Sequence, residues 1–108
     1  MSANYMTTEC NLAGCSFDSR QAYLAWLRMN DQTPMYFERE ATNPFDTNAV
    51  KAVAEGPHGP LHIGYLPKDI AASIAPLMDA GRKIIIVQYK VIGGTEGKSF
   101  GCIVRFCY

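Results

Sequence analysis

The chain has no excess of charge of either sign, because Lys and Arg together number 10 and Asp and Glu together number 10. Proteins that bind nucleic acid without regard to its sequence rely on a positive field over much of their surface. The balanced charge excludes such a global field. Any binding to DNA must therefore be local and must use aromatic side chains as well as charge.

Long apolar runs are also lacking. No segment approaches the roughly 20 apolar residues in succession that a membrane-spanning helix needs. Residues 1–5 do not show the basic and then apolar pattern of a signal peptide, so we expect a cytoplasmic protein with no membrane partner. The 108 residues, 48% of them hydrophobic, suffice for one domain with a single core. We place a flexible N-terminus at residues 1–9 and the domain at residues 10–108.

The four cysteines do not have the arrangement of a metal site. Cys10 and Cys15 are separated by four residues, as are Cys102 and Cys107. Residues five apart on an extended strand point to opposite faces, so neither pair converges on one zinc ion unless a turn lies between them. Reduced thiols that fill small gaps in the core are the better interpretation, and we expect no metal and no cofactor.

Two helical patterns interrupt a chain that is otherwise typical of strands. Apolar side chains at i, i+3 and i+4 predict a first helix, capped by Asp18 or Ser19 and ending near residues 30–31. A second helix is predicted from Pro67 to Gly81, with Pro76 kinking it or splitting off its last turn. The alternating or β-branched segments predict strands over residues 10–17, 34–41, 49–54, 61–66, 83–92 and 100–107.

These elements predict a mainly β domain with two helices. The three central strands are joined by short turns and should form a meander, and a glycine-rich turn should join the last two strands into a hairpin. Closure hides the edges of a sheet in a domain of this size. We therefore expect a small, partly closed barrel of about six strands.

Two blocks of sequence carry the clearest functional signal. The first covers residues 38–50 and is EREATNPFDTNAV; the second covers residues 63–70 and is IGYLPKDI. Turn-forming residues dominate the middle of the first block, and Phe45 stands among them as the one aromatic residue. Such an aromatic either fills the edge of a core, which composition favours, or is available to stack on a flat ligand.

Together with the predicted helix over residues 71–81, these blocks resemble the HIRAN domain family. Its members are small β-rich modules that occur in some DNA-repair helicases and as stand-alone bacterial and phage proteins. The similarity covers nearly the whole chain from about Cys10 onward. It implies an OB-like barrel with helices at its side, and a non-catalytic module that binds single-stranded DNA at its 3′ end.

The resemblance also implies which residues meet the DNA. The aromatic at the end of the first strand corresponds to Phe17 and would stack on the terminal base. An acidic residue, Asp46, would accept a hydrogen bond from the terminal sugar hydroxyl, and Lys68 would meet a backbone phosphate at the start of the second helix. The full set of candidate DNA-binding residues is Phe17, Phe45, Asp46, Tyr65, Lys68 and Phe100.

One position departs from the family pattern. A well-studied helicase member has an arginine just before the stacking aromatic, whereas this chain has Ser16. The loss of that cation removes a phosphate contact, so lower affinity or a different ligand is expected. Each candidate also has a structural alternative: Phe17 and Phe100 could belong to the core, Asp46 could bond its own turn, and Lys68 could be merely solvated.

Three classes of function follow from these patterns. The first is recognition of single-stranded or ended DNA, with a helicase or nuclease as a possible partner. The second is a protein-interaction or self-associating domain, a homo-oligomer included, that holds a peptide or a subunit in the same groove. The third is an enzyme. The sequence does not support this class, because it has no carboxylate cluster, no plausible cysteine–histidine pair and no glycine-rich phosphate motif.

Overall fold

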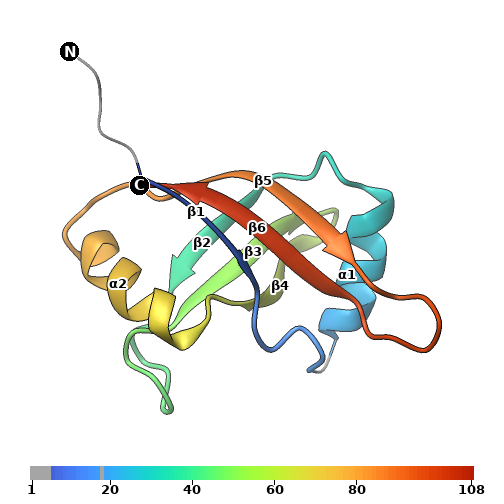
Figure 1. The fold of residues 1–108 in the computed structure, drawn as a ribbon, viewed down its shortest axis with the longest axis horizontal. Helices are drawn as coiled ribbons and strands as arrows, with labels where there is room; N and C mark the ends of the chain where they lie inside the picture. Colours follow the sequence, from blue (N-terminus) through green and yellow to red (C-terminus); the bar gives the residue numbers. More distant parts are fainter. Residues whose placement is uncertain (1–5, 18) are drawn as a thin grey trace.

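The computed structural model describes residues 6–17 and 19–108, and in them the expected order of strands and helices is confirmed (Figure 1). The fold is mixed α/β, with six strands and two helices. In chain order the elements are β1 (Thr7–Asn11), α1 (Arg20–Met29), β2 (Met35–Arg39), β3 (Val50–Gly56), β4 (Gly59–Tyr65), α2 (Lys68–Asp79), β5 (Ile85–Ile92) and β6 (Gly101–Cys107).

The strands form two three-stranded antiparallel sheets, in the orders β1-β6-β5 and β2-β3-β4. The predicted meander and the predicted hairpin are both present. The described residues form no closed barrel, because the strands divide into two separate sheets and a single backbone bridge, between Ala13 and Tyr65, connects the segment after β1 to β4. A side chain of β5 also reaches the loop before β2: the Tyr89 hydroxyl donates to the Thr33 carbonyl at 2.6 Å. Each sheet hides its apolar face against its neighbour, so closure is not needed to bury the core.

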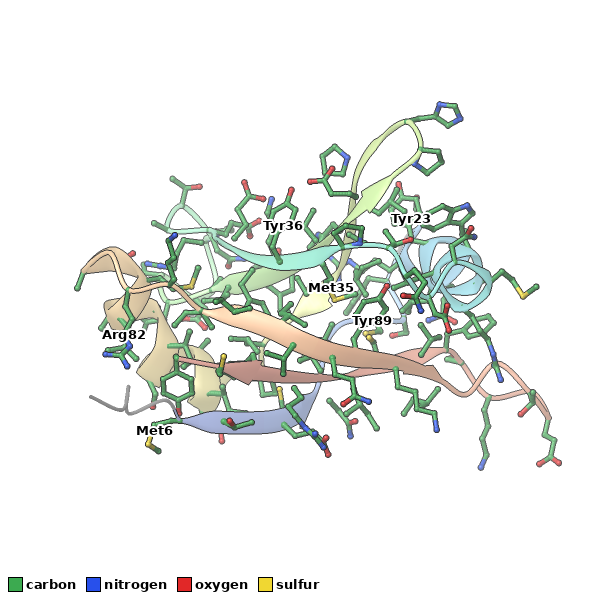
Figure 2. The ribbon with its side chains drawn as sticks, turned by 90° about the horizontal axis from the view of Figure 1, so that it is seen from above. Met6, Tyr23, Met35, Tyr36, Arg82 and Tyr89 are labelled. Atoms are coloured by element: carbon green, nitrogen blue, oxygen red, sulfur yellow. The ribbon has the colours of Figure 1, made fainter. Side chains whose placement is uncertain are left out.

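The core lies between the two sheets. Figure 2 shows Met35 and Tyr36 on opposite sides of β2, with Met35 directed toward the second sheet. The same alternation buries Phe37, whose ring meets that of Phe106 from β6 edge to face, with centroids 5.1 Å apart. This contact joins the two sheets through a favourable aromatic geometry.

The helices pack at opposite ends of the molecule (Figure 1). α1 buries Leu24 and Leu27, and α2 buries Ile74. The predicted disruption at Pro76 does not split off the last turn, since α2 runs through it to Asp79. A positive φ of 89° at Gly81 then ends the helix, as predicted. Neither helix in the described part of the chain is long and apolar enough to cross a bilayer.

The first strand lies earlier in the chain than predicted. β1 covers Thr7–Asn11 and pairs with β6, so residues 7–9 belong to a sheet rather than to a flexible N-terminus. Residues 1–5 lie outside the described residues. After β1 the chain crosses to β4, where Ala13 and Tyr65 exchange backbone hydrogen bonds of 2.7 and 2.9 Å. Gly64 permits this approach, because a Cβ there would lie 2.8 Å from the Ala13 oxygen.

Candidate functional site

An open groove of about 540 Å³ lies where the β1–α1 loop, the β2–β3 loop and the end of β4 meet. It brings together three of the predicted site residues, Phe17, Phe45 and Tyr65. The residues that line it are Ala13, Gly14, Phe17, Arg20, Glu40, Asn43, Pro44, Phe45 and Tyr65. The groove therefore combines aromatic rings with charged and amide groups.

The β2–β3 loop holds Phe45 outward. The Asn43 side-chain oxygen accepts the backbone N–H groups of Phe45 at 2.8 Å and of Asp46 at 3.0 Å. The Asn43 amide nitrogen donates to the Glu40 carboxylate at 2.7 Å, which connects the turn to the end of β2. Phe45 is 91% exposed, so it does not fill the edge of the core. These local hydrogen bonds fix the backbone that presents its ring.

Tyr65 forms a wall of the groove through a bond to Glu40. The Tyr65 hydroxyl donates to Glu40 Oε1 at 2.7 Å. Burial raises the pKa of Glu40, but the hydrogen bonds from Tyr65 and Asn43 and the charge of Lys51 outweigh it, so this pKa is lowered overall. Burial and the bond to Glu40 raise the pKa of Tyr65. At neutral pH the carboxylate is thus ionised and the phenol keeps its proton.

Arg20, the first residue of α1, lies beside two of the aromatic rings. Its Nη1 donates to the Gly14 carbonyl at 2.6 Å, and Gly14 has a positive φ of 71°. Its guanidinium carbon is 5.8 Å from the ring centre of Phe17 and 5.3 Å from that of Tyr65. These distances are in the range of cation–π contacts. Sequence analysis missed Arg20, although a cation three residues after a candidate stacking aromatic was a usable signal.

His62 supports Arg20 from behind the Tyr65 ring. His62 Nε2 lies 3.1 Å from the Gly64 carbonyl and must donate to it, which leaves Nδ1 to accept from Arg20 Nη2 at 3.4 Å. The His62 and Tyr65 rings meet edge to face at 4.7 Å. Burial and the charge of Arg20 lower the pKa of His62, so the neutral imidazole is favoured.

The other three predicted residues do not line the groove. Asp46 follows Phe45, but its Oδ1 accepts the Asn48 N–H at 2.9 Å within its own turn. Lys68 is exposed at the start of α2. Phe100 is half-buried against the core, and its backbone is held by the Gln21 side chain through two bonds of 2.9 Å. Sequence patterns do not show which of these side chains reach the groove, because that depends on how separate loops pack together.

The thiols have the character of core residues. Burial raises the pKa of Cys10 to about 11 and that of Cys102 to about 12, and it also raises the pKa of Cys15. Nucleophiles and zinc ligands act as thiolates, which such high pKa values disfavour. Among the described residues no three His, Cys, Asp or Glu side chains gather as metal ligands would.

A family model of the HIRAN domain matches residues 5–105. The chain belongs to the HIRAN family. HIRAN domains are generally modules that bind DNA ends, and they are typically non-catalytic. No curated protein and no solved structure matched the chain. The match extends over β1 as well as over both blocks quoted above.

Proposed function

We propose that this HIRAN domain holds the 3′ end of a single DNA strand in the groove, with bases stacked on Phe17 and Phe45. The observation that carries the proposal is the exposure of these two rings, 63% for Phe17 and 91% for Phe45, on one groove. Stacking contributes about 1–3 kcal/mol per base and does not depend on which base it is. A neutral protein can bind DNA locally in this way.

Asp46 and Lys68 would act at the rim of the groove. The carboxylate of Asp46 follows directly on the exposed Phe45 and has one oxygen engaged by Asn48, which leaves the second available for a terminal hydroxyl. A carboxylate there would repel a phosphate and accept a hydrogen bond from a hydroxyl. Lys68, together with the N-terminus of α2, would attract a backbone phosphate of the same strand. Phe100 has no place in this proposal, since its ring packs on the core.

Titration of the protein with fluorescent single-stranded oligonucleotides at low salt tests the proposal. The strand that ends in a 3′ hydroxyl should bind more tightly than the strand that ends in a 3′ phosphate. Asp46→Asn should reduce this preference, because the amide keeps an oxygen for the Asn48 N–H but removes the negative charge. Lys68→Ala should weaken binding to all strands alike and lower the salt slope by about one unit.

Two results would contradict the proposal. Equal affinity for hydroxyl and phosphate ends would remove end recognition and leave general binding of single strands. If no oligonucleotide binds at low salt, DNA is not the ligand, and the exposed rings of Phe17 and Phe45 would instead suit a peptide or a second copy of the chain. Light scattering of the purified protein then shows whether it self-associates.

A further inference from the structure

We propose that Arg20 forms a phosphate subsite inside the groove and binds the last internucleotide phosphate of the DNA strand. This inference rests on the proposed function and names the chemical group that the groove selects. Arg20 would also replace the family arginine whose position is taken by Ser16 in this chain. It can do so because its guanidinium reaches the Phe17 ring from the first turn of α1.

The groove holds two charged side chains of opposite sign. Among the described residues that line it, Arg20 and Glu40 are the charged ones. The Glu40 carboxylate accepts hydrogen bonds from Tyr65 and Asn43, and Lys51 lies 3.6 Å from its other oxygen. Those contacts occupy the Glu40 carboxylate, and Lys51, which lies equally close to Glu38, offsets part of its charge. The guanidinium of Arg20 is then the charge that remains to meet a ligand, and it selects an anionic group.

Arg20 is held in place by neutral groups. Its two known hydrogen bonds go to the Gly14 carbonyl and to a His62 nitrogen, and within the described residues it forms no ion pair. A guanidinium has five N–H donors, so donors remain for an incoming ligand. A side chain that is fixed in advance loses less conformational freedom when it binds, which favours a bidentate contact with phosphate.

The aromatic rings give the subsite its position. The guanidinium lies beside both Phe17 and Tyr65, at 5.8 and 5.3 Å from their centres. Arg20 lies over one face of the Phe17 ring, which leaves the opposite face for a base. The sugar and phosphate of that base extend past the ring, within reach of the Arg20 guanidinium. Stacking and the phosphate contact can therefore be made by one nucleotide at the same time.

The experiment pairs a protein variant with a change in the DNA. One oligonucleotide has ordinary phosphates, and a second has a neutral methylphosphonate at the last internucleotide position. The unmodified protein should bind the second about tenfold more weakly, the size of effect expected for a hydrogen-bonded charge pair. Arg20→Gln should bind the ordinary strand about tenfold more weakly and should no longer distinguish the two strands.

Arg28→Gln is the matched control. Arg28 also extends from α1, donates to a glycine carbonyl at 2.6 Å and lies 6.0 Å from a phenylalanine ring centre, but it does not line the groove. This variant should distinguish the two strands as the unmodified protein does. Arg20→Lys keeps a positive charge without the planar fork and should retain part of the preference, which guards against a loss caused by misfolding.

The outcomes separate the two proposals. If the unmodified protein binds neither strand, the proposed function fails and the subsite fails with it. If it binds both strands equally, or if Arg20→Gln still prefers the ordinary strand about tenfold, DNA binding stands and the Arg20 subsite is overturned. Loss of the preference in Arg28→Gln as well would also overturn it, because the effect would then not belong to the groove.

Discussion

Two arginines of α1 each lie over a phenylalanine ring from another segment. The two pairs have nearly the same local chemistry and different surroundings. At the start of the helix Arg20 lies over Phe17, and in its last turn Arg28 lies over Phe100. Each arginine donates to a glycine carbonyl at 2.6 Å. The Phe17 ring is largely exposed on the groove, whereas the Phe100 ring is half-buried against the core.

This difference shows that an aromatic residue beside a cation does not by itself identify a binding site. Phe100 is fixed by the Gln21 side chain and packs closely on Gly94, where a Cβ would overlap its ring. It serves the fold. Phe17 leaves most of its surface open, and that apolar surface gains nothing for the fold by being exposed. The two pairs therefore make opposite predictions for stability and for binding.

The largest expected effect is on stability at the Phe100 pair. Phe100→Ala should lower the free energy of unfolding by about 2–4 kcal/mol, because it removes a ring that packs on the core. Phe17→Ala should cost under about 1 kcal/mol, as is usual for an exposed side chain. Chemical denaturation of both variants measures the difference. Equal losses would erase the distinction between the two pairs.

The second effect is on the affinity for DNA, and here the Phe17 pair should matter more than the Phe100 pair. Phe17→Ala and Tyr65→Ala should each weaken binding to single-stranded DNA by about 1–3 kcal/mol and leave its salt dependence nearly unchanged. Phe100→Ala, measured under conditions where it is folded, should bind as the unmodified protein does. Anisotropy titrations at several salt concentrations test this. Weakened binding in folded Phe100→Ala would extend the interface to the far end of α1.

A smaller effect concerns the loop that presents Phe45. Asn43→Ala removes the acceptor for two backbone N–H groups and the amide that donates to Glu40, and should lower stability by about 1 kcal/mol. Binding should weaken as well, because Phe45 loses its fixed position. The matched control is Thr47→Ala in the same loop, whose backbone carbonyl rather than side chain is used by Arg39. Similar DNA affinity in both variants would show that the loop need not be fixed in advance.

The smallest effect is the dependence of stability on pH through His62. Its pKa in the folded protein is lowered from the ordinary value of 6.5, so the unfolded chain binds the proton more readily. Stability from this residue is present above about pH 6.5 and is lost as the pH falls toward the folded pKa. His62→Gln should flatten that part of the profile. Melting temperatures between pH 5 and 8, roughly the range in which histidine titrates, provide the measurement. An unchanged profile would mean that the support of Arg20 does not depend on the neutral imidazole.

The order of the elements, the meander, the hairpin and the family could all be predicted from the amino-acid sequence. These features depend on local signals: helical periodicity, alternation along strands, and turn residues such as those around Asn43 and Gly81. Residues 38–50 and 63–70 likewise carried the family pattern that the match over residues 5–105 confirmed. Local backbone preferences act over a few residues, so they can be recognised without knowing what lies beside them in space.

The division of the strands into two sheets, and the set of side chains that share the groove, depend on contacts between distant parts of the chain. The contact between Tyr65 and Glu40 spans 25 positions in the chain, and the approach of Ala13 to Tyr65 joins β4 to the loop after β1. These contacts place Arg20 in the groove, while Asp46, Lys68 and Phe100 do not line it. A groove is formed by surfaces that meet when separate elements pack, and the packing is set by the burial of both sheets against each other rather than by any one segment.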